Sequence, residues 1–194
     1  MNGLIATFLL SEFEQFTALY KQTNNDLAPE ALLAFEEFLS TLNKLFDLCG
    51  DLTEEMVEGN AIIQWYSYTT GASSGDCIRA KSKHYYNAEF SNISVNMNEE
   101  EVDDYHTDQG ICFGKVLMLV NIEVKGYHSI FDVALVQWYD FRYDNENGRF
   151  KYGCPLVKLV NIYDFIPVES IIELIHVVPR FDKSNEYFVN YFIF

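Results

Sequence analysis

The spacing of apolar residues changes near residue 76, and this change limits the folds open to the chain. In the N-terminal part, apolar side chains recur every three or four residues, which places them along one face of a helix. Beyond Asp76 the sequence consists of short apolar runs rich in β-branched and aromatic residues, which are typical of strands. We therefore predict an α+β protein in which a helical segment precedes a set of strands.

Two long helices are predicted in the N-terminal part. The first covers Leu4–Tyr20, and the second starts at Pro29, a residue that favours the first turn of a helix. Gly50 follows Cys49 and marks the expected end of the second helix. The helices are joined around Thr23–Asp26, so we expect an N-terminal helical hairpin whose acidic faces contact solvent.

The segment between the hairpin and the strands is less regular. Thr53–Glu58 is predicted to form a short helical turn, whereas the period of Ala61–Tyr66 fits a helix as well as a strand. The run Thr70–Gly75 has the small residues of a flexible linker. We therefore divide the chain into a helical N-terminal segment with its linker, residues 1–75, and a β-barrel domain, residues 76–194.

The second part is predicted to contain about six strands. They are Glu89–Met97, Ile111–Val124, Phe131–Tyr139, Pro155–Val160, Glu173–Val178 and Tyr187–Phe194. Lys125–Gly126 and Asn145–Gly148 have the composition of tight turns between strands. Several short strands with few helical breaks are typical of a small barrel or a sandwich, and we expect a small, mostly antiparallel β-barrel.

The charge of the chain is strongly acidic and unevenly distributed. The 194 residues include 13 basic and 29 acidic side chains, which gives a formal net charge of −16. Residues 1–110 hold 5 of the basic and 19 of the acidic side chains, whereas residues 111–194 hold 8 and 10. This balance argues against direct nucleic-acid binding and against docking on anionic lipid. A basic partner, such as a histone tail, fits the electrostatics.

The candidate metal ligands lack the spacing of a known site. Cys77 and His84, like His106 and Cys112, do not have a standard zinc-ligand spacing. The run Glu99–Asp108 supplies many carboxylates but lacks the alternating ligands and central glycine of a calcium loop. We expect a solvated acidic loop there, and we predict no metal and no cofactor.

The cysteines and the absence of targeting segments suggest where the protein acts. Cys49, Cys77, Cys112 and Cys154 form no CxxC pair, which favours buried free thiols in a reducing compartment. The apolar N-terminus lacks the basic region of a signal peptide, and no run is long enough to span a membrane. We expect an intracellular protein with no membrane contact.

Motifs that support catalysis are missing from the sequence. There is no GxSxG elbow, no GxxxxGK[ST] phosphate loop and no GxGxxG after a predicted strand. Carboxylates are so frequent in the first half that no catalytic pair stands out. We therefore expect a binding protein rather than an enzyme.

Aromatic residues are the strongest candidates for a binding site. Trp138, Tyr139 and Phe141 end the clearest predicted strand, and Tyr163 lies further along the chain. Rigid rings at strand ends can line a pocket for a peptide, or for a quaternary ammonium held against the ring faces. The same rings can instead cap the core of a barrel. We predict these four residues as the ligand-binding site and keep the core role as the alternative.

The second part of the chain carries a recognisable order of short motifs. In chain order these are Gly110–Leu117, Val133–Tyr139, Pro155–Leu159, Phe165–Ile171, His176–Phe181 and Tyr187–Phe192. This order resembles the C-terminal region of fungal transposase-like proteins of the Kyakuja-Dileera-Zisupton and Plavaka groups. The resemblance implies a chain derived from a mobile element. Because the length and strand pattern do not suit a nuclease, it implies a detached C-terminal module.

The same order of motifs is similar to a bromo-adjacent homology (BAH) domain. Val136–Tyr139 and Val168–Ile171 match the positions of that family's strand and turn motifs, whereas Asn190 departs from its last strand. The resemblance implies a small β-barrel that binds proteins, in some cases methylated histone tails. From it we expect a non-catalytic interaction module, in the nucleus rather than the cytoplasm. The alternative is an accessory segment that assembles with a transposase and binds no ligand of its own.

Overall fold

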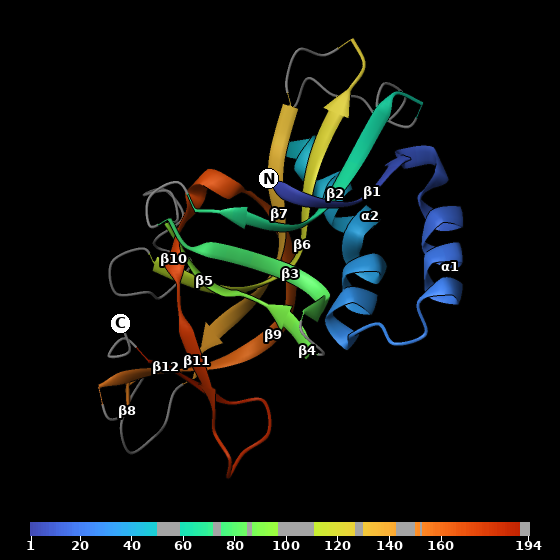
Figure 1. Ribbon diagram of the computed structural model, residues 1–194. Coiled ribbons are helices and arrows are strands. Elements are labelled where there is room, and N and C mark those ends of the chain that lie inside the picture. Colours follow the sequence, from blue (N-terminus) through green and yellow to red (C-terminus); the bar gives the residue numbers. More distant parts are fainter. Residues whose placement is uncertain are drawn as a thin grey trace.

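The computed structural model describes residues 1–49, 59–71, 75–84, 87–96, 111–126, 130–142, 150–151 and 153–190. Within these ranges, two α-helices accompany a large antiparallel sheet that curls strongly (Figure 1). The helices are α1 (Phe13–Thr23) and α2 (Pro29–Cys49), and 3₁₀ turns cover Leu10–Glu12 and Val168–Ser170. The strands are β1 (Asn2–Leu9), β2 (Ala61–Thr70), β3 (Cys77–His84), β4 (Asn87–Phe90), β5 (Asn92–Asn96), β6 (Ile111–Val124), β7 (Ile130–Phe141), β8 (Phe150–Lys151), β9 (Cys154–Pro167), β10 (Ile171–Leu174), β11 (His176–Pro179) and β12 (Tyr187–Asn190).

The long strands β6, β7 and β9 form the centre of the sheet. β2 extends the sheet beside β6, and β1 and β3 both pair with β2. On the other side β12 and then β11 follow β9, while β5 pairs with both β6 and β10. β10 leads through Ile175 into β11, so chain continuity rather than strand pairing completes a ring of strands, β6–β7–β9–β12–β11–β10–β5, in which all other neighbours are paired. The sheet is thus curled into a half-barrel, which confirms the predicted α+β class with a barrel-like antiparallel sheet.

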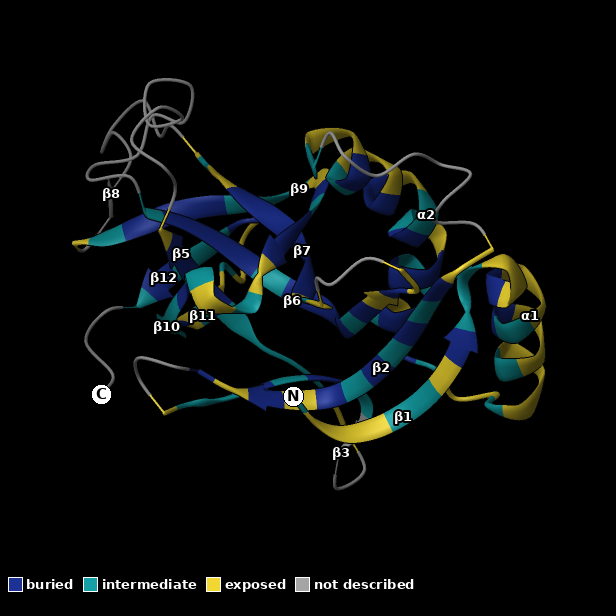
Figure 2. Cartoon of the chain, turned by 90° about the horizontal axis from the view of Figure 1, so that it is seen from above, coloured by how far each residue is buried: buried dark blue, intermediate teal, exposed yellow. Residues whose placement is uncertain are grey.

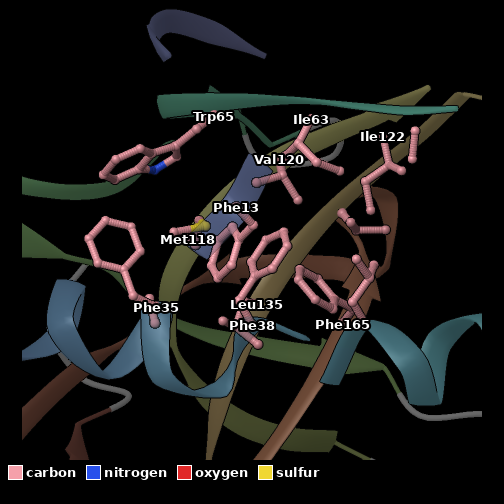
Figure 3. Packing of buried hydrophobic residues seen from close by; sticks show 14 of the residues in the cluster. Phe13, Phe35, Phe38, Ile63, Trp65, Met118, Val120, Ile122, Leu135 and Phe165 are labelled. Atoms are coloured by element: carbon pink, nitrogen blue, oxygen red, sulfur yellow. The ribbon is translucent and has the colours of Figure 1, made fainter. Parts of the chain in front are cut away.

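Helix α2 covers one face of the central strands and buries an apolar core against them. Phe38, which is fully buried, stacks on Phe13 of α1 with 4.5 Å between ring centroids. It also meets Phe165 of β9 edge-on at 5.5 Å. Figure 3 shows these rings between α2 and the strands, together with Leu135 and Met118. This helix-covered core joins the N-terminal helices to strands far along the chain.

The opposite face of the central strands has an apolar core of its own. Gly114 of β6 lies directly opposite Trp138 of β7, and the indole ring covers it. A Cβ at Gly114 would collide with the side chain of Val136 and lie 3.3 Å from the Trp138 ring. The absence of a side chain at residue 114 therefore lets the tryptophan lie close to the sheet.

A third, smaller core fills the ring of strands. One buried apolar residue comes from each of β6, β7, β9 and β12, and one from the link between β10 and β11. They are Phe113, Tyr139, Val157, Val189 and Ile175. Residues that are distant in sequence thus meet inside the ring, as in a small barrel.

The predicted helix over Leu4–Tyr20 is wrong in its first half. Asn2–Leu9 is strand β1, and the helix begins only at Phe13. The apolar residues in this short run fit the period of a helix as well as that of a strand. Antiparallel pairing with β2 makes the segment a strand. The N-terminal segment therefore contributes a strand to the sheet as well as two helices.

The helix predicted to begin at Pro29 is confirmed as α2. Ala61–Tyr66, left open between helix and strand, belongs to β2, where buried residues alternate with more exposed ones. Thr53–Glu58 lies outside the described residues. β2 and β3 pair through Thr70 and Cys77, so the predicted linker connects two adjacent strands. The division of the chain into two parts at residue 75 stays a prediction. Residues from both parts belong to one sheet and to one apolar core.

Most predicted strands are confirmed, with changed bounds. Ile111–Val124 is β6, and the strands around Phe131–Tyr139 and Pro155–Val160 are longer than predicted. Two predicted strands are each divided in two, as β4 with β5 and as β10 with β11. The last one is confirmed over β12 only, since residues 191–194 are outside the described ranges. The acidic run at residues 99–108 and the predicted turn at residues 145–148 also lie outside the described ranges.

Candidate functional site

Trp138, the first predicted site residue, is buried between strands and has a hydrogen-bond partner. Its side chain is 6% exposed and packs with Val136 and Ile166 in the core opposite α2. The indole N–H donates a hydrogen bond of 2.7 Å to Oδ2 of Asp164 on β9. A tryptophan held in this way supports the fold of the sheet.

Tyr139 and Phe141 lie in the core of the ring of strands. The Tyr139 hydroxyl donates to Oδ1 of Asn92 at 2.8 Å, and the ring meets Tyr187 edge-on at 5.7 Å. Phe141 is half-buried and packs against Phe113, with ring centroids 5.9 Å apart. Burial raises the pKa of Tyr139 well above its ordinary value, and Tyr187 and Glu30 raise it further. This phenol is therefore protonated at neutral pH.

Tyr163 belongs to the core under α2. Its side chain is 6% exposed, and its hydroxyl lies 3.4 Å from Nε2 of Gln137 and 3.5 Å from Oδ1 of Asn161. Burial raises the pKa of Tyr163, and the carboxylates of Glu37 and Glu36 on α2 raise it further. The polar end of Tyr163 thus lies near acidic residues of the helix.

The four predicted residues do not gather around one space. Trp138 lies in the core opposite α2, Tyr163 in the core under α2, and Tyr139 and Phe141 inside the ring. Neighbouring residues of a strand point to opposite faces, which separates Trp138 from Tyr139. Their role as a ligand site stays a prediction. Every one of the four has packing partners in the folded chain.

A row of polar residues crosses the sheet between two of these cores, and sequence reasoning missed it. Asn92, Lys115, Gln137 and Tyr163 lie opposite one another in β5, β6, β7 and β9. Lys115 Nζ is 3.2 Å from Oε1 of Glu30, near the start of α2. The Gln137 amide donates to the backbone carbonyl of residue 160 at 2.9 Å. The ion pair between Lys115 and Glu30 connects this polar row to the beginning of α2.

The polar row could be recognised only once the strands were paired. Lys115 and Gln137 stand alone within apolar runs, which is the one local sign that each faces something polar. The register that brings them together depends on irregularities that add residues to β6 and to β9. Those irregularities leave no clear mark in a single sequence.

A polar surface lies where α2 packs against β9, the strand that carries Tyr163. Glu36 is exposed and Glu37 half-buried on the helix, while Asn161 is exposed beside Tyr163 on the strand. We call these four residues the acidic edge. The carboxylates of Glu36 and Glu37 and the amide of Asn161 offer acceptors for cationic and N–H groups, whereas Tyr163 is largely buried. The arrangement suits a basic peptide better than an anion.

Among the described residues there is neither a cluster of metal ligands nor a helix that could cross a membrane. No group of three or more His, Cys, Asp or Glu side chains there could hold a metal ion. The four cysteines carry free thiols, and Cys112 is buried. No described helix has both the length and the apolar character needed to cross a membrane.

Comparison with protein-family models, with curated proteins and with solved structures found no match to the chain.

Proposed function

We propose that the protein is a non-catalytic interaction module that binds a basic protein segment along the acidic edge. The observation that carries this proposal is the exposed carboxylate of Glu36 and the half-buried one of Glu37 on the helix that packs against β9, where both raise the pKa of Tyr163. It combines negative charge with an aromatic residue at the border between a helix and a strand. A lysine-rich or arginine-rich segment could pair its charges with the carboxylates while its stem packs on the strand.

The charge distribution around α1 and α2 supports the same partner. Residues 1–49 contain seven carboxylates and two lysines. Glu12, Glu14, Glu36 and Asp47 are all exposed. A negative surface attracts a basic segment over a distance and speeds its association, most strongly at low ionic strength.

The proposal also extends to the family of the barrel and to the identity of the basic partner. We propose that the ring of strands is a BAH-like barrel and that the basic segment is a histone tail met in the nucleus. The half-barrel sheet supports the architecture, and the negative charge supports the partner. An origin from a fungal transposon also stays a proposal, and so does the alternative of an accessory segment that assembles with a transposase.

Fluorescence anisotropy with a labelled, lysine-rich histone-tail peptide tests the proposal. The double variant Glu36→Gln/Glu37→Gln should bind at least about tenfold more weakly than the original protein at low salt. The matched control is Glu12→Gln/Glu14→Gln, which removes the same charge from the region around the start of α1. The control should lose clearly less affinity, because only the first pair lies at the acidic edge.

Two results would overturn the proposal. If both double variants lose affinity equally, attraction is set by net charge and the acidic edge is no site. If the original protein does not bind the peptide even at low salt, a basic partner is wrong. Methylated and unmethylated forms of the peptide, compared in the same titration, test the histone-reader part separately.

A further inference from the structure

Strand β1 is the outermost strand on its side of the sheet. It pairs with β2 alone among the described strands, through register positions from Asn2 with Tyr68 to Leu9 with Ile62. Figure 2 shows it on the outside of β2, with exposed residues along its first half. The side of β1 away from β2 therefore presents backbone groups that a further strand can pair with.

This edge carries little of the protection that edge strands usually have. Asn2–Leu9 contains no charged residue and no proline, although the whole chain has a net charge of −16. Leu4 is 56% exposed. One irregularity between Leu4 and Ala6 interrupts the register, and Ala6–Leu9 continues regularly. Charges, prolines and bulges are the common means of blocking an edge, and only the last is present here.

We propose that two copies of the chain associate through antiparallel pairing of β1 with β1. A two-fold axis places the same uncharged segment opposite itself, so every donor and acceptor finds its equivalent and no like charges meet. Leu4 of each copy then comes close to the other copy and loses contact with water. The inference is independent of the acidic edge, which lies between α2 and β9.

A second copy is the occupant that the uncharged sequence of β1 suits, because pairing the segment with itself brings no like charges together at the contact. A foreign basic segment would pair with the carboxylates of the helices, whereas β1 offers it no charge at all. An acidic foreign strand would be repelled by the net charge of the chain. Two identical copies also repel each other through that charge. Their association should therefore become stronger as salt screens the repulsion, unlike the binding of a basic peptide.

Sedimentation velocity measures the proposed dimer directly. The mass of the original protein should rise between about 1 µM and about 1 mM, because a single strand pair gives a weak interface. Leu4→Lys should raise the dissociation constant at least about tenfold, because it puts two like charges at the contact. Ile130→Lys is the matched control, since Ile130 is 64% exposed on β7 and lies away from β1. The control should dimerise like the original protein.

A second variant and a second measurement keep the test decisive. Thr7→Lys changes an exposed residue in the regular part of β1, and should weaken the dimer even if Leu4→Lys folds poorly. Hydrogen exchange should show amides of β1 becoming protected as concentration rises. A protein that stays monomeric over the whole range and at all salt concentrations would overturn the proposal. So would an equal loss in the Ile130→Lys control.

Discussion

The two tryptophans are buried to almost the same extent, yet different interactions hold their side chains in place. Trp65 is 4% exposed in the core under α2, and its nearest ring neighbours are Tyr20 at 5.1 Å and Phe35 at 5.4 Å. Among the described residues its indole N–H has no hydrogen-bond partner. Trp138 is 6% exposed on the opposite face, and its N–H is hydrogen-bonded to Asp164.

A similar difference separates the helix-covered core from the ring of strands, which includes β7 with Trp138 and β9 with Asp164. The helix-covered core is built mainly from apolar and aromatic side chains that meet edge-on or stacked. The strands of the ring are held in addition by directional polar pairs. Arg180, which is 10% exposed, pairs with Glu186 at 2.9 Å, and Glu186 also pairs with Arg142 at 3.3 Å. The first region thus depends on shape and volume, and the second also on the fit of specific donors and acceptors.

Removing a ring from the helix-covered core should give the largest effect. Phe38→Ala takes away the fully buried ring that contacts both Phe13 and Phe165, and so leaves a cavity between α2 and the sheet. We expect the free energy of unfolding to fall by about 3–5 kcal/mol, measured by urea denaturation.

The control for this change is Phe181→Ala, which removes the same ring from a surface position. Phe181 is 95% exposed, so its loss should change the free energy of unfolding by less than about 0.5 kcal/mol. If Phe38→Ala costs no more than the control, α2 is not packed on the sheet as described. The contrast between the two regions would then lose its basis.

Exchanging each tryptophan for phenylalanine separates volume from hydrogen bonding. Trp138→Phe leaves the Asp164 carboxylate without its indole donor, so we expect a loss of about 1–3 kcal/mol in the free energy of unfolding. Trp65→Phe removes an N–H that has no partner in the described part of the chain, and should cost less. The same urea titrations measure both. Equal losses would mean that volume alone decides the stability in both regions.

The parts of the fold that local sequence determines were predicted well. The apolar period and the proline gave α2, and the long apolar run gave β6 with the bounds that the structure has. Residues 4–9 were predicted wrongly because a short apolar run satisfies both periods. Its state is decided by β2, which lies more than fifty residues away in the sequence.

The candidate site shows a stronger dependence on distant contacts. Trp138 and Tyr139 were grouped because they are neighbours in sequence, although alternation along a strand already places neighbours on opposite faces. Whether a ring points into a core or into solvent depends on which strands curl over it. The polar row needs four strands in a register set by bulges. No local pattern contains that information.

The smallest expected effect is on the free energy of unfolding at alkaline pH. It differs between a tyrosine in the ring of strands and one in the helix-covered core. The pKa of Tyr139 is raised from 10.0 by burial, and further by Tyr187 and Glu30, whereas burial alone raises the pKa of Tyr20 under α2. The unfolded chain releases these protons near pH 10, while the folded protein keeps them to higher pH. The stabilisation is therefore complete below pH 10 and is lost as the pH rises towards the folded pKa. Loss of the Tyr139 contribution should lower the free energy of unfolding by about 1 kcal/mol between about pH 9 and pH 11, and the Tyr20 contribution should be smaller. Tyr139→Phe should flatten this decline more than Tyr20→Phe, because the interactions with Tyr187 and Glu30 add to burial only at Tyr139. Urea denaturation over this pH range measures both slopes. A flatter slope in Tyr20→Phe than in Tyr139→Phe would show that neighbouring groups in the ring of strands add nothing to burial.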